Sequence, residues 1–189
     1  MFTRRSFMLG LVTAVAVPRA ALAANTHHRH YSINPRFSPQ QVAYSREYAP
    51  GTVVIDPRQR FLFLVIRPSI ARRYGVGVGR AGLEWSGRAV IGRKEQWPHW
   101  RPTDDMIERN PRKYARYADG VDGGPHNPLG ARALYLYSSE GEDTLYRIHG
   151  TNEPWTIGHA VSNGCIRMLN EHVVDLYDRV RIGTPVVVL

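Results

Sequence analysis

From residue 51 onward, the chain alternates short β-branched and aromatic runs with residues that favour turns. Residues 52–55 and 61–66 are two such runs, and 56–59 (Asp-Pro-Arg-Gln) between them supply turn residues, so the pair predicts a β-hairpin. The same pattern predicts strands over 85–96, 132–137, 144–149 and 186–189. The sequence therefore predicts a mostly β fold of mixed α/β character, with a curved sheet or sandwich flanked by short helices.

Two helices are expected beside this sheet. Thr103 is placed to cap a short helix over 104–109 that Pro111 ends, and Asn170 is placed to cap a helix that runs to about residue 181. An apolar stripe at helical spacing predicts that the second helix packs against the core. Residues 118–130 are rich in glycine, aspartate and proline and predict a long loop, of the kind that often forms the wall or lid of a site.

Gly75, Gly77 and Gly79 alternate with apolar residues. A phosphate-binding loop would need a lysine followed by Ser or Thr, and a dinucleotide-binding loop would need a helix after it. The segment has neither feature, so neither kind of loop is predicted. A strand whose glycines allow close approach of another backbone is the favoured interpretation.

The composition indicates one folded domain with a basic surface. The chain has 189 residues, of which 43% are hydrophobic, and this suffices for one core. Its formal net charge is +9; residues 1–23 supply three of these charges and no acid, so about +6 remains on the rest. A basic surface suits an anionic partner or serves solubility alone. No RNA-binding signature is present, and no nucleic-acid partner is expected.

The first 23 residues predict an export signal of the twin-arginine type. Arg4 and Arg5 precede an apolar core over 9–17, and Ala21-Leu22-Ala23 fits a small-x-small cleavage site. The apolar core is shorter than the ~20 residues that a membrane span needs, so an anchor helix is the less favoured alternative and no stable span is expected. The protein is therefore expected to be periplasmic.

Residues 24–48 are polar, with Pro35 and Pro39 interrupting any helix, and predict an irregular linker to a folded domain over 49–189. His27, His28 and His30 form a small cluster in this linker, which fits either a metal site or, more simply, a solvated tail. No Cys/His spacing typical of zinc sites occurs, so neither a metal nor a cofactor is expected.

Cys165 is the single cysteine of the chain, and His149 lies 16 residues before it at the end of an expected strand. Exported proteins usually pair their cysteines, so a single one indicates a reactive thiol, with an inert buried cysteine as the alternative. Histidine is the usual base that activates a thiol. His126 and His159 are rival bases, but neither ends a strand as His149 does. Gly164 allows a sharp turn, and the N–H groups of Gly164 and Cys165 are candidates for an oxyanion hole.

The residues around this pair resemble a known catalytic signature. His149-Gly150-Thr151 followed by Ser162-Asn163-Gly164-Cys165-Ile166-Arg167-Met168 is similar to the motif of the L,D-transpeptidase catalytic domain (YkuD) family. Trp97-Pro98 and 127–130 (Asn-Pro-Leu-Gly) also resemble that family, and the resemblance covers roughly residues 50–189. Many members have histidine where this chain has Asn163, which leaves the role of this side chain open.

The resemblance implies a mixed-β domain that acts on the peptide stems of bacterial peptidoglycan. Cys165 is implied to attack the amide between the L-centre of a diamino acid and the following D-residue. The resulting thioester is implied to react with an amine from a second stem or from an outer-membrane protein. Members that use water instead act as carboxypeptidases or endopeptidases, and a non-catalytic wall-binding module is a further alternative.

The resemblance also implies roles for neighbouring residues. His149 is implied to be the base, oriented by the backbone carbonyl of Gly150. Two roles fit Arg167, which either holds a substrate carboxylate or forms an ion pair within the domain. Ser162 either shapes the turn or hydrogen-bonds near the thiol, and Asn163 is expected beside it on the substrate-binding side.

Overall fold

The computed structural model describes residues 32–81, 83 and 85–189, so the predicted export signal and the cluster of His27, His28 and His30 lie outside the described residues. Within them, nine strands form a mixed sheet in the order β1-β4-β3-β2-β11-β6-β7-β8-β10, and β5 pairs with β9 in a second sheet. This architecture, with its short helices, confirms the predicted mostly β fold.

The elements are short, and most of them are strands. The strands are β1 (Gln40–Ala43), β2 (Val53–Asp56), β3 (Phe61–Arg67), β4 (Ile70–Gly75), β5 (Val78–Gly79), β6 (Gly87–Gln96), β7 (Arg132–Tyr137), β8 (Asp143–His149), β9 (Ala160–Ser162), β10 (Ile166–Arg167) and β11 (Pro185–Val188). The helices are α1 (Asp104–Arg109), α2 (Pro111–Tyr114) and α3 (Asn170–Arg179), with 3-10 turns η1 (Pro35–Phe37), η2 (Ala115–Tyr117) and η3 (Pro154–Thr156). None of the helices in the described residues is long and apolar enough to span a membrane.

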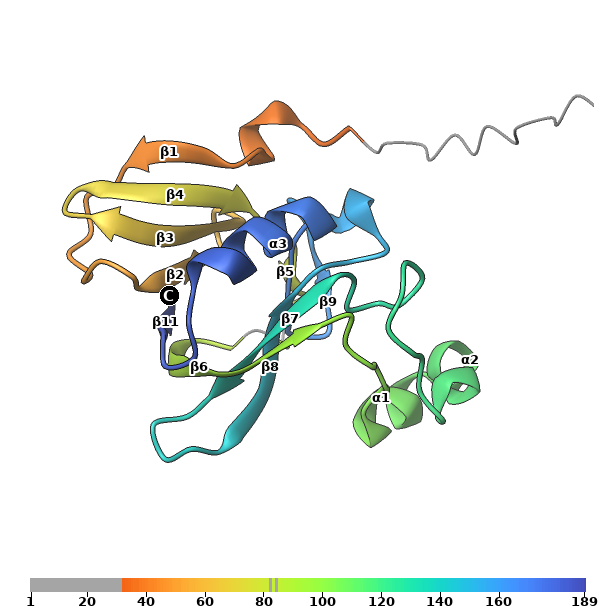
Figure 1. The fold of residues 1–189 in the computed structure, drawn as a ribbon. Helices are drawn as coiled ribbons and strands as arrows, with labels where there is room; N and C mark the ends of the chain where they lie inside the picture. Colours follow the sequence, from red (N-terminus) through yellow and green to blue (C-terminus); the bar gives the residue numbers. More distant parts are fainter. Residues whose placement is uncertain (1–31, 82, 84) are drawn as a thin grey trace, which may run out of the picture. The chain divides into compact units, whose positions relative to one another are not determined.

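The C-terminal strand β11 joins two groups of strands. It pairs parallel with β2 and antiparallel with β6, so the strands of residues 53–75 continue through it into those of residues 87–149. At the far edge, β10 pairs parallel with β8. Figure 1 shows α3 between the β2–β4 group and the β7–β8 group. The sheet therefore curves around α3, and its β8–β10 edge carries the candidate site.

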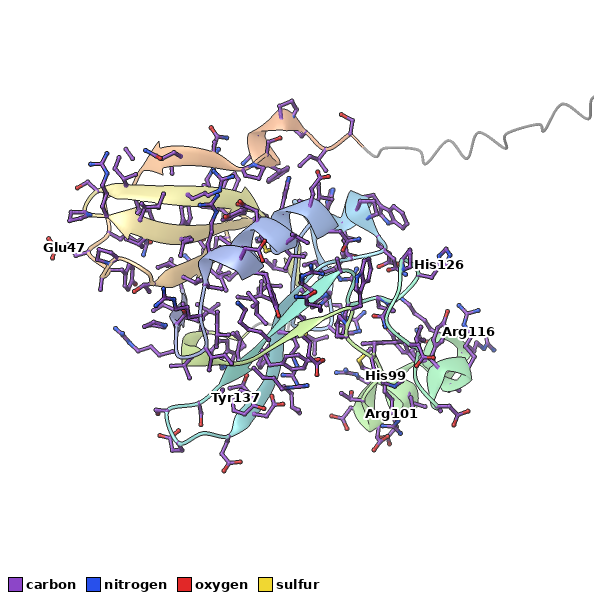
Figure 2. The ribbon with its side chains drawn as sticks, viewed as in Figure 1. Glu47, His99, Arg101, Arg116, His126 and Tyr137 are labelled. Atoms are coloured by element: carbon purple, nitrogen blue, oxygen red, sulfur yellow. The ribbon has the colours of Figure 1, made fainter. Side chains whose placement is uncertain are left out.

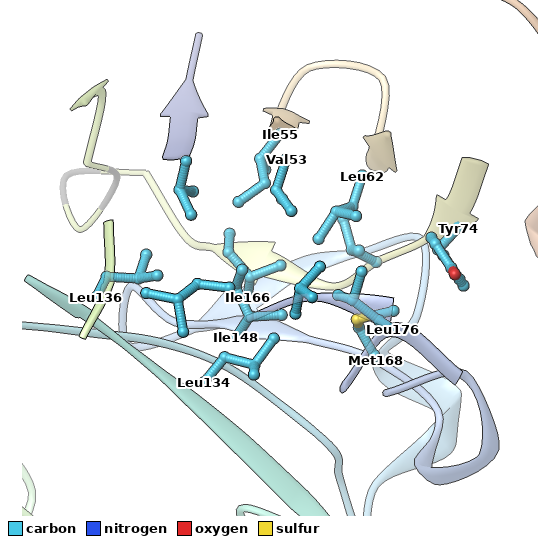
Figure 3. Close-up of a cluster of buried hydrophobic side chains, with 14 of the residues drawn as sticks. Val53, Ile55, Leu62, Tyr74, Leu134, Leu136, Ile148, Ile166, Met168 and Leu176 are labelled. Carbon is cyan, nitrogen blue, oxygen red and sulfur yellow. The ribbon is translucent and has the colours of Figure 1, made fainter. Parts of the chain in front are cut away.

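The main hydrophobic core draws side chains from both strand groups and from α3. Val53, Leu62, Leu134, Ile148 and Leu176 are fully buried in one cluster (Figure 3). Because Ile148 precedes His149 directly, packing of this cluster fixes the end of β8 from which the histidine extends.

We expect Leu134→Ala to lower the free energy of unfolding by about 2–5 kcal/mol, because it removes a fully buried side chain and leaves a cavity. Ile182→Ala is the matched control: Ile182 is 66% exposed. Its replacement should change the free energy by less than about 0.5 kcal/mol. Urea unfolding followed by tryptophan fluorescence measures both variants. Equal losses in the two would show that the core is wrongly assigned.

The predicted hairpin and the first helix cap are present. Strands β2 and β3 pair antiparallel, and Asp56 closes the turn by accepting the backbone N–H groups of Arg58 and Gln59 at 3.1 and 3.0 Å. The Thr103 hydroxyl accepts the N–H of Met106 at 3.2 Å, as expected of an N-cap.

The expectation of irregular structure over 24–48 is wrong for its second half, where η1 and β1 lie. Residues 40–43 pair antiparallel with β4, and the ring of Phe37 packs on Phe61 with centroids 5.5 Å apart. The pairing is made by backbone groups at a sheet edge, and the largely exposed side chains of this strand carry no alternating apolar pattern.

Three further boundaries differ from the sequence expectation. The alternation predicted over 144–149 is interrupted because Leu145 has a φ of 62° and lies exposed at an irregular step in the pairing of β7 with β8. Pro111 does not simply end α1, since it is the first residue of α2. Asn170 is the first residue of α3 rather than its cap, and α3 ends at Arg179.

Candidate active site

The pairing of β10 with β8 brings His149 and Cys165 into one cavity. Arg167 is aligned with His149, and the N–H of Met168 donates to the His149 carbonyl at 2.8 Å. Cys165 lies just before β10. Both His149 and Cys165 line a cavity of about 210 Å³, here called the nucleophile cavity.

The imidazole of His149 is held in one tautomer. The side chain is buried, and Nδ1 lies 2.6 Å from the carbonyl oxygen of Gly150. A carbonyl oxygen only accepts hydrogen bonds, so Nδ1 carries the proton and Nε2 keeps a free lone pair. This is the contact with Gly150 that the family resemblance implies, and it leaves Nε2 able to take a proton.

Asn170 fixes the backbone around Gly150, a function that the sequence does not reveal. Its Oδ1 accepts the N–H of Ala131 at 3.0 Å and the N–H of Thr151 at 3.2 Å. The first turn of α3 thereby links the start of β7 to the residue after Gly150. A cap was expected because asparagine before an apolar stripe is typical of a helix start, yet this side chain satisfies two distant donors instead.

Ser162 shapes the turn that presents the thiol. Its hydroxyl donates to the Cys165 carbonyl at 2.6 Å and accepts the Gly164 N–H at 3.1 Å. Gly164 itself has a φ of 119°, a conformation that a side chain would strain. In this structure the Gly164 N–H, an expected oxyanion-hole donor, is paired with Ser162. The Cys165 N–H has no hydrogen-bond partner among the described residues.

Arg167 forms an ion pair within the domain, one of its two expected roles. Its Nη1 lies 2.5 Å from Oε2 of Glu153, and its side chain is mostly buried. Both residues line the nucleophile cavity. Glu153 lies in a loop and carries no local sequence signal, so only the fold identifies it as the partner.

Asn163 connects the turn to the segment that contains α1 and α2. Its Nδ2 donates to the Tyr114 hydroxyl at 2.9 Å, and its Oδ1 accepts from Arg80 at 3.4 Å. Tyr114 therefore lines the same cavity as Cys165. Sequence reasoning missed Tyr114, which belongs to an otherwise exposed helix.

The loop over 118–130 forms part of the cavity wall, as predicted, through Pro128 and Leu129. Its conformation depends on the buried amide of Asn127, whose Nδ2 donates to the carbonyl oxygens of residues 98, 121 and 122. The Asn127 Oδ1 accepts the Leu129 N–H at 2.8 Å. One side chain thus holds both ends of the segment that carries α1 and α2.

Burial favours the neutral forms of both His149 and Cys165. Burial lowers the pKa of His149 from 6.5 to about 3, and the nearby cation of Arg167 lowers it further, against the opposing Gly150 hydrogen bond. Burial raises the pKa of the Cys165 thiol above its usual value, although the Arg147 N–H and the charges of Arg147 and Arg167 act in the opposite direction. A thiol and a neutral imidazole fit transfer of the proton during attack rather than a standing ion pair.

The two rival histidines do not contact the thiol. His126 is exposed, and Figure 2 shows it on the side of the domain that carries α1 and α2. His159 is exposed and lines a neighbouring cavity that lacks Cys165. No group of three or more metal-ligating side chains gathers in the part of the chain that the structure describes.

Comparison with known proteins identifies the family. A model of the L,D-transpeptidase catalytic domain (YkuD) matches residues 50–188. The chain belongs to the YkuD family. The match contains His149, Cys165 and the residues around them, so the resemblance inferred from these motifs is confirmed at the level of the family.

Curated relatives of this YkuD domain are longer proteins. A probable L,D-transpeptidase of Escherichia coli K12, ErfK/SrfK, is 33% identical over 157 residues, which cover 80% of this chain and 47% of the relative. A second probable L,D-transpeptidase of that strain, YbiS, is 31% identical over 152 residues, covering 78% and 47%. The chain thus spans about half the length of the curated relatives it matches.

Solved structures share the YkuD fold. An L,D-transpeptidase mutant from Enterococcus faecium has a TM-score of 0.52 at 15% identity, over 73% of this chain and 49% of that one. A Brucella melitensis protein described as a probable carnitine operon oxidoreductase is 58% identical with a TM-score of 0.57, over 85% of this chain and 99% of that one.

Proposed function

We propose that this chain is a peptidoglycan L,D-transpeptidase that uses Cys165 as its nucleophile. The observation that carries the proposal is the nucleophile cavity, which is lined both by Cys165 and by a histidine whose Nε2 has no hydrogen-bond partner among the described residues. Family membership supports transpeptidation as the reaction class. The names of the relatives, probable L,D-transpeptidases, support the amide between an L-centre and a D-residue as the bond that is attacked.

In the proposed first step, Cys165 Sγ attacks the carbonyl between the L-centre of a diamino acid and the terminal D-residue of a donor tetrapeptide. His149 Nε2 takes the thiol proton and passes it to the leaving amine. The Cys165 N–H is the donor available for the oxyanion. The C–N bond breaks, the terminal D-amino acid leaves, and a thioester remains on Cys165.

In the proposed second step, an amine attacks the thioester and gives its proton to His149. A new amide forms and the thiol is restored. An outer-membrane protein amine is one candidate acceptor and a second stem is another. If water is the acceptor, the same thioester is hydrolysed and the protein is an L,D-carboxypeptidase or endopeptidase. A non-catalytic wall-binding module would form no thioester at all.

The proposed site of action is the periplasm. The twin-arginine motif over residues 1–23 supports export, and the charge of about +6 on the rest suits the free carboxylates of the wall. The oxidoreductase description of the Brucella melitensis protein is not carried over. Gly75 ends β4, Gly79 lies in β5, and the next element that the structure describes is strand β6, whereas a dinucleotide-binding loop needs a following helix.

Product analysis tests the proposal. Purified protein is incubated with disaccharide-tetrapeptides, and the products are identified by mass spectrometry. Cross-linked dimers are the expected result. Trimmed monomers alone would favour the hydrolase, and unchanged substrate would favour a wall-binding module.

The rate of Cys165 acylation is expected to stay flat between pH 7 and pH 5. Because the pKa of His149 lies near 3 rather than 6.5, the imidazole remains neutral and able to accept a proton across this range. Stopped-time mass spectrometry of the acyl-enzyme at each pH measures the rate. A loss centred near pH 6.5 would show that His149 titrates as an ordinary exposed histidine.

A further inference from the structure

We infer that Tyr146 is a positioning residue whose ring sets where the nucleophile Cys165 lies relative to the base His149. The ring packs directly on the turn of residues 162–165, here called the thiol turn. A Cβ added at Gly164 would lie 2.8 Å from Tyr146 Cε1 and 3.5 Å from Tyr146 Cδ1. Tyr146 does not line the nucleophile cavity, so it acts through the thiol turn rather than on the substrate. The inference rests on the proposed function and adds a residue to its machinery.

Strand β8 carries both the base and the ring that supports the nucleophile. In the parallel pairing of β8 with β10, His149 is aligned with Arg167. The same register, continued three residues towards the N-terminus, places Tyr146 opposite Gly164, in agreement with the contact between them. Because both side chains extend from one strand, the place of the thiol relative to the imidazole depends on how the ring supports the thiol turn.

A bulge in β8 directs Tyr146 towards the thiol turn. The pairing of β7 with β8 shifts so that residues 144–146 lie opposite residue 136 alone. Leu145, in the middle of this bulge, has a φ of 62° and is 66% exposed. A left-handed backbone is uncommon for a residue other than glycine, and an exposed leucine has no packing reason to adopt it. Bulges beside active sites re-aim a side chain, and here the side chain that follows is the ring of Tyr146.

Side-chain hydrogen bonds hold the bulge in this conformation. The Thr144 hydroxyl donates to the Leu136 carbonyl at 2.7 Å and accepts the Tyr146 N–H at 3.2 Å. The Asp143 carboxylate accepts the Leu145 N–H at 2.8 Å. These bonds replace strand pairing that the bulge interrupts, so the backbone at Tyr146 remains fixed.

Trp85 holds the ring itself. Its ring stacks on that of Tyr146 with the centroids 5.2 Å apart and the planes 23° apart. Both side chains are partly buried against the main hydrophobic core. A stacked pair that packs on a core has few alternative arrangements, so the ring presents a fixed surface to the thiol turn.

Two pairs of variants test the inference. Tyr146→Ala removes the ring, whereas Tyr146→Phe keeps it. Leu145→Val places a β-branched residue at a φ of 62°, which such a residue does not tolerate, whereas Leu145→Gly accepts this conformation. Because Leu145 is exposed, neither change at this position empties a cavity. Val54→Ala is the control for stability, since it shortens a fully buried side chain in a separate cluster.

The rate of thioester formation is measured over a range of donor concentrations, at a temperature where circular dichroism shows each variant folded. Tyr146→Ala and Leu145→Val are expected to lower the maximum rate by on the order of 10²-fold, as a displacement of about 1 Å at the reacting groups does. The donor concentration at half-maximal rate should change less than about threefold, because Tyr146 does not line the nucleophile cavity. Tyr146→Phe, Leu145→Gly and Val54→Ala should keep both quantities close to wild type.

Alkylation by iodoacetamide gives a second reading that needs no peptidoglycan substrate. Cys165 Sγ displaces iodide, and His149 takes the thiol proton. His149→Gln should slow alkylation strongly in the wild-type background and much less in the Tyr146→Ala background, where the base and the thiol are already out of place.

Three results would overturn the inference. The first is a wild-type maximum rate in Tyr146→Ala or in Leu145→Val. The second is a loss in Val54→Ala as large as that in Tyr146→Ala, which would reduce the ring to a role in stability. The third is an equal effect of His149→Gln on alkylation in both backgrounds. If the wild type forms no thioester while alkylation still shows the coupling of Tyr146 with His149, the proposed function fails and the inference stands.

Discussion

Cys165→Ala should form no acyl-enzyme and should lower product formation by on the order of 10⁴–10⁶-fold, because it removes the only thiol in the chain. His149→Gln should slow thioester formation by about 10²–10⁴-fold, since glutamine cannot take the thiol proton. Single-turnover assays with a donor tetrapeptide measure both effects.

His126→Gln provides the matched control for the histidine. His126 is exposed, and the cavity that holds Cys165 does not include it. Its carbonyl accepts from Asn152 at 2.7 Å, a backbone contact that the substitution keeps. The variant should keep the wild-type rate within about twofold. A large loss in His126→Gln together with an active His149→Gln would mean that the base has been assigned to the wrong residue.

Gly150→Ala is expected to have the second largest effect. A Cβ at this position would lie 2.2 Å from Asn170 Oδ1 and 3.0 Å from the Ala131 backbone nitrogen, so the backbone has to shift. The shift moves the carbonyl that holds His149 Nδ1. We expect a loss of about 1–3 kcal/mol in the free energy of unfolding. A displacement of about 1 Å at the imidazole should slow thioester formation by on the order of 10²-fold.

Gly124→Ala tests whether this effect is specific to the position. A Cβ added at Gly124 would have no non-neighbouring heavy atom within 4 Å, and the φ angle of Gly124 lies outside the left-handed region. Chemical denaturation and the single-turnover rate should both stay close to wild type. If Gly150→Ala behaves like Gly124→Ala, the contact between Gly150 and His149 does not position the base.

The contact of His149 with Gly150 and the turn that carries Cys165 could be predicted from sequence because they lie in two short segments. His149 and Gly150 are adjacent, and Ser162, Gly164 and Cys165 form one turn, so local geometry decides most of their contacts. Even here, one hydrogen bond was not predicted. The Gly164 N–H is used by Ser162, and a side chain two residues away can satisfy such a group without any sequence signal.

The remaining parts of the site depend on contacts between distant segments. Asn170 bonds residues 39 and 19 positions away, and Asn163 meets a tyrosine 49 positions away. Glu153 is one of several acids that local composition cannot distinguish as the partner of Arg167. Strand β1 was missed for a related reason, since an edge strand is held by backbone pairing and needs no apolar alternation.

Mass spectrometry of the intact protein after brief exposure to a donor tetrapeptide tests the central claim most directly. The account predicts a mass increase equal to the donor less its terminal D-amino acid, and peptide mapping should locate this adduct on Cys165. The adduct should disappear when an amine acceptor is added. Turnover of the tetrapeptide with no adduct at Cys165, or with an adduct on another residue, would contradict the account.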